Sequence, residues 1–225
     1  FNLAWGDAVI VAPESAAGNA TAPVGTGPFR FVEWGKGDHV DIVRNPDYWG
    51  TPAKLESATF KFIGDPTAAF AALMAEDIDA FPNFPAPETL AQFANDPRFE
   101  VVVGSTEGET ILAMNNARPP LDNVKVREAI AHAIDRQAII DGAMFGYGTP
   151  IGTHFAPHHP DYVDLTAQSD HDPERARQLL AEAGVGEITL SLKLPPVEGY
   201  ARRGGEIIAS QLAAVGIKTQ TTNLE

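Results

Sequence analysis

Four of the chain's six histidines fall close together and come nearest to a metal-binding pattern. His154, His158 and His159 share one stretch, and His171 follows it. Neutral imidazoles are good ligands for nickel or zinc. Their spacing fits no regular metal motif, however, and the prolines between them indicate an exposed loop. We therefore expect neither a bound metal nor a cofactor.

Residues that could carry out covalent chemistry are equally scarce. No Ser-His-Asp set, pair of carboxylates or activated nucleophile stands out, and cysteine is absent. The segment 25–28, Gly-Thr-Gly-Pro, looks superficially like a phosphate loop. A strand pattern rather than a helix follows it, and Pro28 has no N–H to donate to an anion. We expect a protein that is not an enzyme.

Large aromatic and basic side chains have structural explanations that compete with ligand binding. Trp34, Tyr48 and Trp49 could stack on a ligand, but they belong to a hairpin pattern, and we expect them to cover its sheet. Arg127 and Arg136 lie in a helical pattern, where we expect them to form ion pairs.

Composition limits the possible partners. The chain has 16 Lys and Arg against 30 Asp and Glu, a formal net charge of −14, which argues against nucleic acid and anionic membranes. Apolar residues make up 44% of the chain, enough to bury a core. No apolar run reaches the length of about 18 residues that a membrane-spanning helix needs.

The clearest local pattern is a hairpin over residues 29–44. Period-two alternation predicts two faces: Phe29, Phe31 and Glu33 on one, and Arg30, Val32 and Trp34 on the other. The residues Gly-Lys-Gly-Asp at 35–38 supply the turn. Asn-Pro at 45–46 ends the second strand, because Pro cannot donate to the ladder.

The rest of the chain reads as alternating strands and helices. Asp65-Pro66 opens a helix between strands at 58–63 and 78–81, which would form a β-α-β unit. A second such unit is expected over residues 187–222. The other expected elements are an irregular loop at 12–28, a short helix at 88–95, strands at 101–103 and 111–114, and helices at 121–134, 135–144 and 172–183. Asp135 and Asp172 should cap the last two helices, and Gly184 should end the last one. The expected buried stripe of the helix at 121–134 is Val126, Ala129, Ile130, Ala133 and Ile134. The fold class is α/β, or α+β with mixed sheets.

Several ordered blocks resemble one known family. The hairpin region 25–50 is similar to the hallmark of the extracytoplasmic solute-binding proteins of family 5, which feed peptide and nickel ABC importers. Further blocks lie at 73–80, 114–136, 172–184 and 187–222. In the first of these, Glu76 stands where the family usually has Gly. Together the blocks cover nearly the whole chain.

The resemblance implies a periplasmic-binding-protein-like fold of two lobes around a hinge. Family members run to roughly twice this length, a size typical of several domains. The chain would then be an incomplete, central fragment. Residues 1–109 would belong to the first lobe and residues 110–225 to the second.

The resemblance also nominates residues that face the cleft between the lobes. They are expected on a loop after the strand at 78–81 and on the crossing strand near 110–115. The ligand-binding residues expected in this way are Phe81, Asn83, Phe84, Thr110, Met114 and Asn115. The alternative for Phe81, Asn83 and Phe84 is a surface loop that prolines hold in place, with its aromatic rings in the core. The alternative for Asn115 is a hydrogen bond to the backbone.

By this resemblance the protein binds a small solute, expected to be an oligopeptide or dipeptide, on the periplasmic or extracellular side of a bacterial membrane. Lobe closure would signal to an ABC permease as partner. A carrier of nickel, glutathione, an opine or an oligosaccharide is the alternative on the same scaffold. A hydrolase or a signalling module could also reuse the fold.

An incomplete sheet would leave strand edges and apolar surface exposed. We therefore also expect a chain of residues 1–225 to self-associate.

Overall fold

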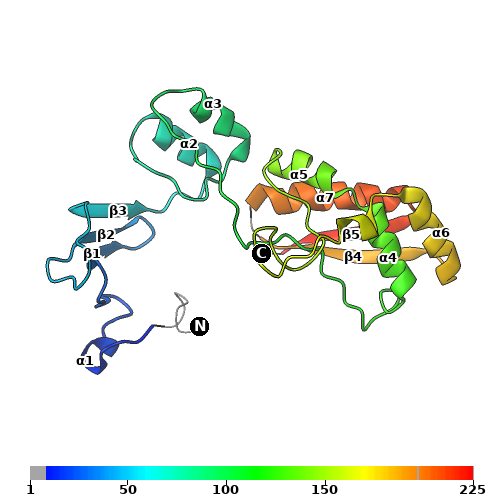
Figure 1. Ribbon diagram of the computed structural model, residues 1–225, viewed down its shortest axis with the longest axis horizontal. Coiled ribbons are helices and arrows are strands. Elements are labelled where there is room, and N and C mark those ends of the chain that lie inside the picture. Colours follow the sequence, from blue (N-terminus) through cyan, green and yellow to red (C-terminus); the bar gives the residue numbers. More distant parts are fainter. Residues whose placement is uncertain (1–8, 197, 225) are drawn as a thin grey trace. The chain divides into compact units, whose positions relative to one another are not determined.

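The structure is a computed structural model that describes residues 9–196 and 198–224. The chain divides into two compact units, Phe1–Phe84 and Pro85–Glu225 (Figure 1). The expected lobe boundary at 109/110 falls inside the second unit. The assignment of residues 1–109 and 110–225 to two lobes of a larger protein stays a prediction, and each unit is described by itself.

The first unit contains a three-stranded antiparallel sheet in the order β1-β2-β3. Its strands are β1 (Phe29–Gly35), β2 (His39–Arg44) and β3 (Ser57–Lys61). The expected hairpin turn is confirmed: the Asp38 amide donates to the Gly35 carbonyl at 3.0 Å. Gly37 has a φ of +79°, a conformation that glycine adopts without steric cost.

A β-bulge in β1 changes which side chains share a face of this sheet. Phe31 pairs with Ile42 and Trp34 pairs with Val40, and the register shifts between Phe31 and Glu33. Ile42 and Val40 lie two residues apart and so point to the same face. Trp34 therefore shares a face with Phe31, and Glu33 lies on the other. The expected faces were wrong from the bulge onward, because an extra residue resets the period of two.

Helices of the first unit are short. α1 (Pro13–Ala16) is a single turn within the stretch expected to be irregular. α2 (Pro66–Met74) begins as expected, with the Asp65 side chain accepting from the Ala68 amide at 2.7 Å.

The strand expected at 78–81 is absent, so the first β-α-β unit was wrong. β3 pairs antiparallel with β2 instead. Residues 101–103 and 111–114 are not strands either. A strand needs a neighbour to accept its hydrogen bonds, and no described strand pairs with any of these three segments.

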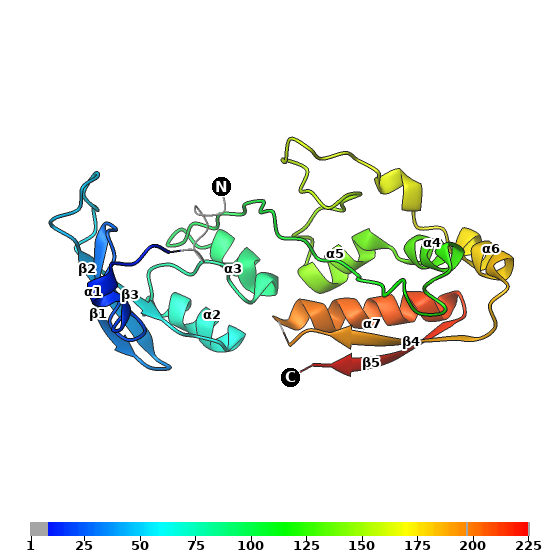
Figure 2. The same cartoon turned by 90° about the horizontal axis from the view of Figure 1, so that it is seen from below.

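The second unit is a helical layer on a two-stranded parallel sheet (Figure 2). Its helices and strands are η2 (Pro87–Thr89), α3 (Leu90–Ala94), α4 (Val124–Ala133), α5 (Arg136–Met144), η3 (Thr166–Ser169), α6 (Pro173–Ala183), β4 (Ile188–Leu194), α7 (Glu198–Ala214) and β5 (Ile217–Asn223). β4 and β5 pair in parallel around α7, which confirms the second expected β-α-β unit.

Side-chain caps set the ends of these helices as the sequence predicted. Asp135 accepts from the Ala138 amide at the start of α5, and Asp172 accepts from the Arg175 amide at the start of α6. Gly184 ends α6 with a φ of +63°.

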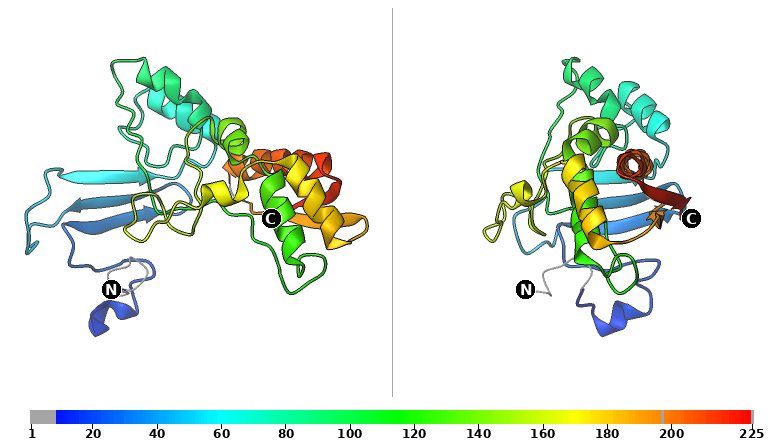
Figure 3. Two further views of the ribbon diagram at one scale, coloured as in Figure 1. Left: turned by 45° about the vertical axis from the view of Figure 1, so that its right-hand side comes forward. Right: turned by 90° about the vertical axis from the view of Figure 1, so that its right-hand side faces the viewer.

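The core of the second unit forms where α4 and α6 pack side by side (Figure 3) and, with α7, cover β4 and β5. Four of the five residues expected in the buried stripe of α4 are buried: Val126, Ala129, Ile130 and Ala133. The fifth, Ile134, follows the end of the helix and is half-buried. Ile217 of β5 is completely buried beneath these helices. The described chain is thus a mixed α/β structure, as expected. No helix in its described residues is long and apolar enough to cross a membrane.

Candidate functional site

The first expected binding segment lies at the end of the first unit. The rings of Phe81 and Phe84 meet edge to face, with centres 5.6 Å apart, and both are half-buried. Asn83 between them is exposed and has a φ of +53°. The segment is a tight turn that presents one amide side chain to solvent and is pinned by an aromatic pair.

The second expected segment lies in the other unit. Thr110 is exposed, whereas Met114 is half-buried and packs with Leu112 against the core of that unit. Asn115 is exposed, and its side-chain oxygen accepts from the Ala117 amide at 3.1 Å. This bond is the backbone alternative that the sequence left open for Asn115. Contact of any of these residues with a solute stays a prediction.

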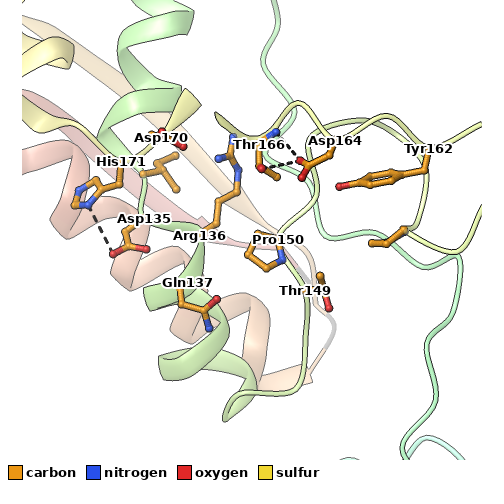
Figure 4. Close-up of a pocket in the computed structure, with 12 residues that line it drawn as sticks. Asp135, Arg136, Gln137, Thr149, Pro150, Tyr162, Asp164, Thr166, Asp170 and His171 are labelled. Carbon is orange, nitrogen blue, oxygen red and sulfur yellow. Dashed lines mark hydrogen bonds and ion pairs between the residues drawn. The ribbon is translucent and has the colours of Figure 1, made fainter. Parts of the chain in front are cut away.

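A pocket of about 530 Å³ lies wholly within the second unit and opens broadly to solvent (Figure 4). The start of α5 forms one side, and the long loop between α5 and α6 forms the other. It is lined by Ile134, Asp135, Arg136, Gln137, Thr149, Pro150, Pro157, Tyr162, Asp164, Thr166, Asp170 and His171. None of the six expected binding residues is among them.

Hydrogen bonds between side chain and backbone hold the loop against the helices. Arg136 donates from Nη1 to the Ser169 carbonyl at 3.0 Å. Nδ1 of His132 lies 2.8 Å from the Asp170 carbonyl oxygen, a bond in which the ring nitrogen donates. His171 Nδ1 lies 3.7 Å from Asp135 Oδ2 at the N-cap of α5. These contacts hold in place Asp170 and His171, which line the pocket.

Asp164 lines the pocket from the loop between α5 and α6 and accepts two hydrogen bonds from Thr166. Its Oδ1 accepts from the Thr166 hydroxyl at 2.7 Å and from the Thr166 amide at 3.0 Å. These bonds, with a smaller contribution from Tyr162, lower the pKa of Asp164 below its ordinary value, because they favour the charged form. Asp164 is therefore an ionised acceptor at neutral pH.

Close backbone approach explains why Gly152 stands in this loop. A Cβ on Gly152 would lie 2.5 Å from the backbone nitrogens of Leu165 and Thr166. Only glycine allows the two arms of the loop to approach this closely.

Chemically, the pocket is rich in acceptors, because its lining contains three carboxylates, Asp135, Asp164 and Asp170, and one guanidinium, that of Arg136. Such a lining suits polar groups that donate hydrogen bonds. The sequence indicated one part of it, the Asp135 cap. No sequence pattern indicated the other lining residues, because they come together only when residues 149–171 fold back onto α5.

Three histidines of the loop between α5 and α6, His154, His158 and His159, contact carboxylates or an aromatic ring. His154 lies 3.1 Å from Glu109, and His158 lies 2.7 Å from Glu107. The ring of His159 stacks on Phe155 with centres 4.5 Å apart. Among the described residues, no group of three or more His, Cys, Asp or Glu side chains could hold a metal ion.

Two structural expectations for large side chains were wrong. Trp49 is 81% exposed and so does not cover the sheet. Arg127 donates to the Leu121 carbonyl at 2.8 Å, and Arg136 bonds Ser169 instead of a carboxylate. Both guanidinium groups satisfy backbone oxygens near helix ends, which a helical pattern alone does not reveal.

Comparison with known proteins gives the class. Residues 4–225 match the family described as "Bacterial extracellular solute-binding proteins, family 5 Middle". The chain therefore belongs to this family and corresponds to its middle part, as the resemblance of its sequence blocks implied. Its members are binding proteins rather than enzymes, and the family's description agrees with the expected location outside the cytoplasm.

Curated relatives bind different solutes. Heme-binding protein A of Haemophilus influenzae is 32% identical over 208 residues, which are 90% of this chain and 38% of that protein. The glutathione-binding protein GsiB of Salmonella choleraesuis is 34% identical over 207 residues, 90% of this chain and 40% of that protein. The chain thus spans well under half the length of these relatives.

Solved structures confirm the periplasmic-binding-protein-like fold class. AgaA of A. tumefaciens R10 in complex with agropinic acid has a TM-score of 0.77 at 28% identity, covering 100% of this chain and 47% of that one. A dipeptide-binding protein from Pseudoalteromonas sp. SM9913 in complex with Met-Leu gives the same values.

Proposed function

We propose that the protein captures oligopeptides or dipeptides outside the cytoplasm and delivers them to an ABC permease. The observation that carries this proposal is the family match over residues 4–225. One relative is named a glutathione-binding protein, and glutathione is itself a peptide. A solved relative whose structure matches 100% of this chain was determined in complex with the dipeptide Met-Leu.

The chemistry of the two expected binding segments supports a peptide. Asn83, Thr110 and Asn115 are exposed and can both donate and accept hydrogen bonds, as a peptide backbone requires. Phe81 and Phe84 add apolar surface for side chains. None of these side chains is charged, which suits a ligand recognised mainly through neutral amide groups.

The alternative is a carrier of another solute on the same scaffold. A heme-binding relative and a relative solved with agropinic acid favour this candidate. Lobe closure around the solute would operate in the same way in either case.

The test is calorimetric titration of the full-length protein with Met-Leu, a set of tri- to pentapeptides, glutathione, heme, nickel and agropinic acid. We expect peptides to bind most tightly and to reduce the radius of gyration measured by X-ray scattering. Tight binding of heme, nickel or agropinic acid without any peptide binding would overturn the peptide assignment.

A further inference from the structure

The segment 101–111 is an exposed stretch of chain between two anchored points. Before it, the rings of Phe99 and Phe93 meet with centres 5.0 Å apart; after it, Leu112 packs against the core of the second unit. The segment forms neither helix nor strand, and within the described residues none of its amides or carbonyls takes part in a backbone–backbone hydrogen bond. Ordering such a stretch costs conformational entropy, so side-chain contacts must hold it.

Two histidines of the loop between α5 and α6 contact this segment. Nδ1 of His154 lies 3.1 Å from Oε2 of Glu109, and Nε2 of His158 lies 2.7 Å from Oε1 of Glu107. A carboxylate can only accept, so the ring nitrogen of His154 donates to Glu109. The Glu109 side chain is only 18% exposed. Among the residues that the structure describes, His154 is its one side-chain partner.

The order of the contacts fixes the direction of the segment as well as its position. His154 pairs with Glu109 and His158 with Glu107, so the loop and the segment run antiparallel between the two contacts. One exposed pair stabilises little by itself. The second pair forms more readily, because the first has already brought the two segments together. Two contacts also prevent the segment from pivoting about either one.

The α5–α6 loop is itself held in shape where it makes these contacts. The His159 amide donates to the Ala156 carbonyl at 2.8 Å, and the Thr153 hydroxyl donates to the Val163 carbonyl at 3.3 Å. Each bond begins at a direct neighbour of one of the two contacting histidines. These histidines therefore extend from a folded part of the loop, which can restrain the segment opposite.

We propose that His154 and His158 are positioning residues, which fasten the segment 107–110 to the α5–α6 loop and so hold Thr110 ready for the peptide. Thr110 directly follows Glu109 in the chain. A segment that is ordered beforehand loses less conformational freedom on binding, which makes the complex tighter. The inference rests on the proposed function, because Thr110 is one of its expected binding residues.

The test is the double variant His154→Ala/His158→Ala of the full-length protein, which removes both contacts and keeps both glutamates. Calorimetric titration with Met-Leu should show an affinity about 2- to 10-fold lower than that of the wild type, the loss expected when two exposed pairs disappear. Its melting temperature should change little, because both histidines lie on the surface.

A second measurement reports on the segment without peptide. Glutamyl endopeptidase cleaves after glutamate, and mass spectrometry identifies the cuts after Glu107 and Glu109. In the double variant we expect these two cuts to form about 2- to 10-fold faster than in the wild type, because a released segment is more often open to the protease.

Asp161→Ala is the matched control. It also truncates an exposed polar side chain of the α5–α6 loop, but the Asp161 carboxylate lies 3.9 Å from His159, within the loop itself. This variant should leave both the peptide affinity and the two cleavage rates as in the wild type.

A charge exchange separates pairing from side-chain size. Glu109→Lys should lower the peptide affinity, because it places a cation beside His154. Adding His154→Glu to this variant restores an opposite pair and should recover most of the affinity. Failure of the exchanged pair to recover any affinity would contradict the positioning role.

The outcomes distinguish the positioning role from the proposed function. If the wild type binds Met-Leu and the double variant binds it equally well, the role of the two histidines is overturned while peptide binding stands. Weaker binding without faster cleavage overturns that role as well, since the histidines would then act on the solute directly. If the wild type binds no peptide, the proposed function is overturned, and the positioning role with it.

Discussion

At the scale of single residues, three non-glycine positions in the described part of the chain have a left-handed backbone: Glu76, Asn83 and Phe145. Glu76 follows α2 in a Schellman motif. Its amide donates to the Leu73 carbonyl at 3.0 Å, and the Asp77 amide donates to the Ala72 carbonyl at 2.9 Å. This motif favours glycine at the position of Glu76, which gives a physical reason for the glycine usual in the family.

Replacing Glu76 with Gly should stabilise the protein relative to Glu76→Ala by about 1 kcal/mol, because alanine keeps the left-handed strain. Comparison with alanine cancels the loss of the glutamate's own contacts. Urea unfolding of the two variants measures the difference. Equal stabilities would contradict the assignment of strain to this residue.

Asn83 allows its backbone and side-chain roles to be separated. Asn83→Gly keeps the left-handed turn but removes the amide, whereas Asn83→Ala removes the amide and strains the turn. If the amide binds the solute, both variants should lose up to about tenfold in peptide affinity, and only the alanine variant should lose stability. Wild-type affinity in Asn83→Gly would show that Asn83 serves the turn alone.

His39 should make stability depend on pH near neutrality. A hydrogen bond with Asp38 is the largest cause raising the pKa of His39 above 6.5, and Asp41 and Glu33 raise it further. The folded state therefore favours the charged ring. The stabilising contribution is complete below about pH 6.5 and is lost as the pH rises through the folded-state pKa.

The measurement is urea unfolding of the wild type and of Asp38→Asn at mildly acidic and mildly alkaline pH. The wild type should be more stable than the variant at the acidic pH, and this difference in stability should narrow at the alkaline pH. If the stability difference between the wild type and Asp38→Asn grows as the pH rises, the predicted interaction between Asp38 and charged His39 is contradicted.

At the scale of elements, the start of α6 connects a cap to the core. Asp172 accepts from the Arg175 amide at 2.9 Å, and its own amide donates to the His132 carbonyl at the end of α4. The cap thus fixes where α6 begins and how it meets α4, the helix against which it packs.

Asp172→Ala should destabilise the protein by about 0.5–2 kcal/mol, the usual value of such a cap. Asp172→Ser should retain most of the stability, because a hydroxyl can accept the same bond. Chemical unfolding followed by circular dichroism provides the test. If serine and alanine are equally destabilising, the side-chain bond is not the cause.

At the scale of the whole molecule, the sheet of the first unit exposes an apolar row. Trp34, Val40 and Phe60 are paired across its three strands. Trp34 is 42% exposed and Phe60 is 56% exposed. Contiguous apolar surface of this kind promotes association in water.

We predict that a chain of residues 1–225 self-associates through this row as its concentration rises. Replacing both Trp34 and Phe60 with Thr, which keeps strand propensity, should reduce the mass measured by light scattering. Val43→Thr is the control, because Val43 is 40% exposed on the opposite face. A monomeric wild type at high concentration would refute this prediction.

The sequence alone determined the features that depend on neighbours within a few residues. The caps at Asp65, Asp135 and Asp172 and the turn at Gly37 are local hydrogen-bonding and steric choices, so their patterns were sufficient. The buried stripe of α4 follows equally from helical periodicity. The family followed from the order of such blocks along the chain.

Only the tertiary structure decided features that need a partner distant in the chain. The bulge in β1 appears only in its pairing with β2, and residues 78–81 read as a strand yet have no described neighbour to pair with. The pocket and the contacts of His154 with Glu109 and of His158 with Glu107 join segments far apart in sequence. Periodicity says which way a side chain faces along its own element, but the contact it makes depends on how separate elements pack.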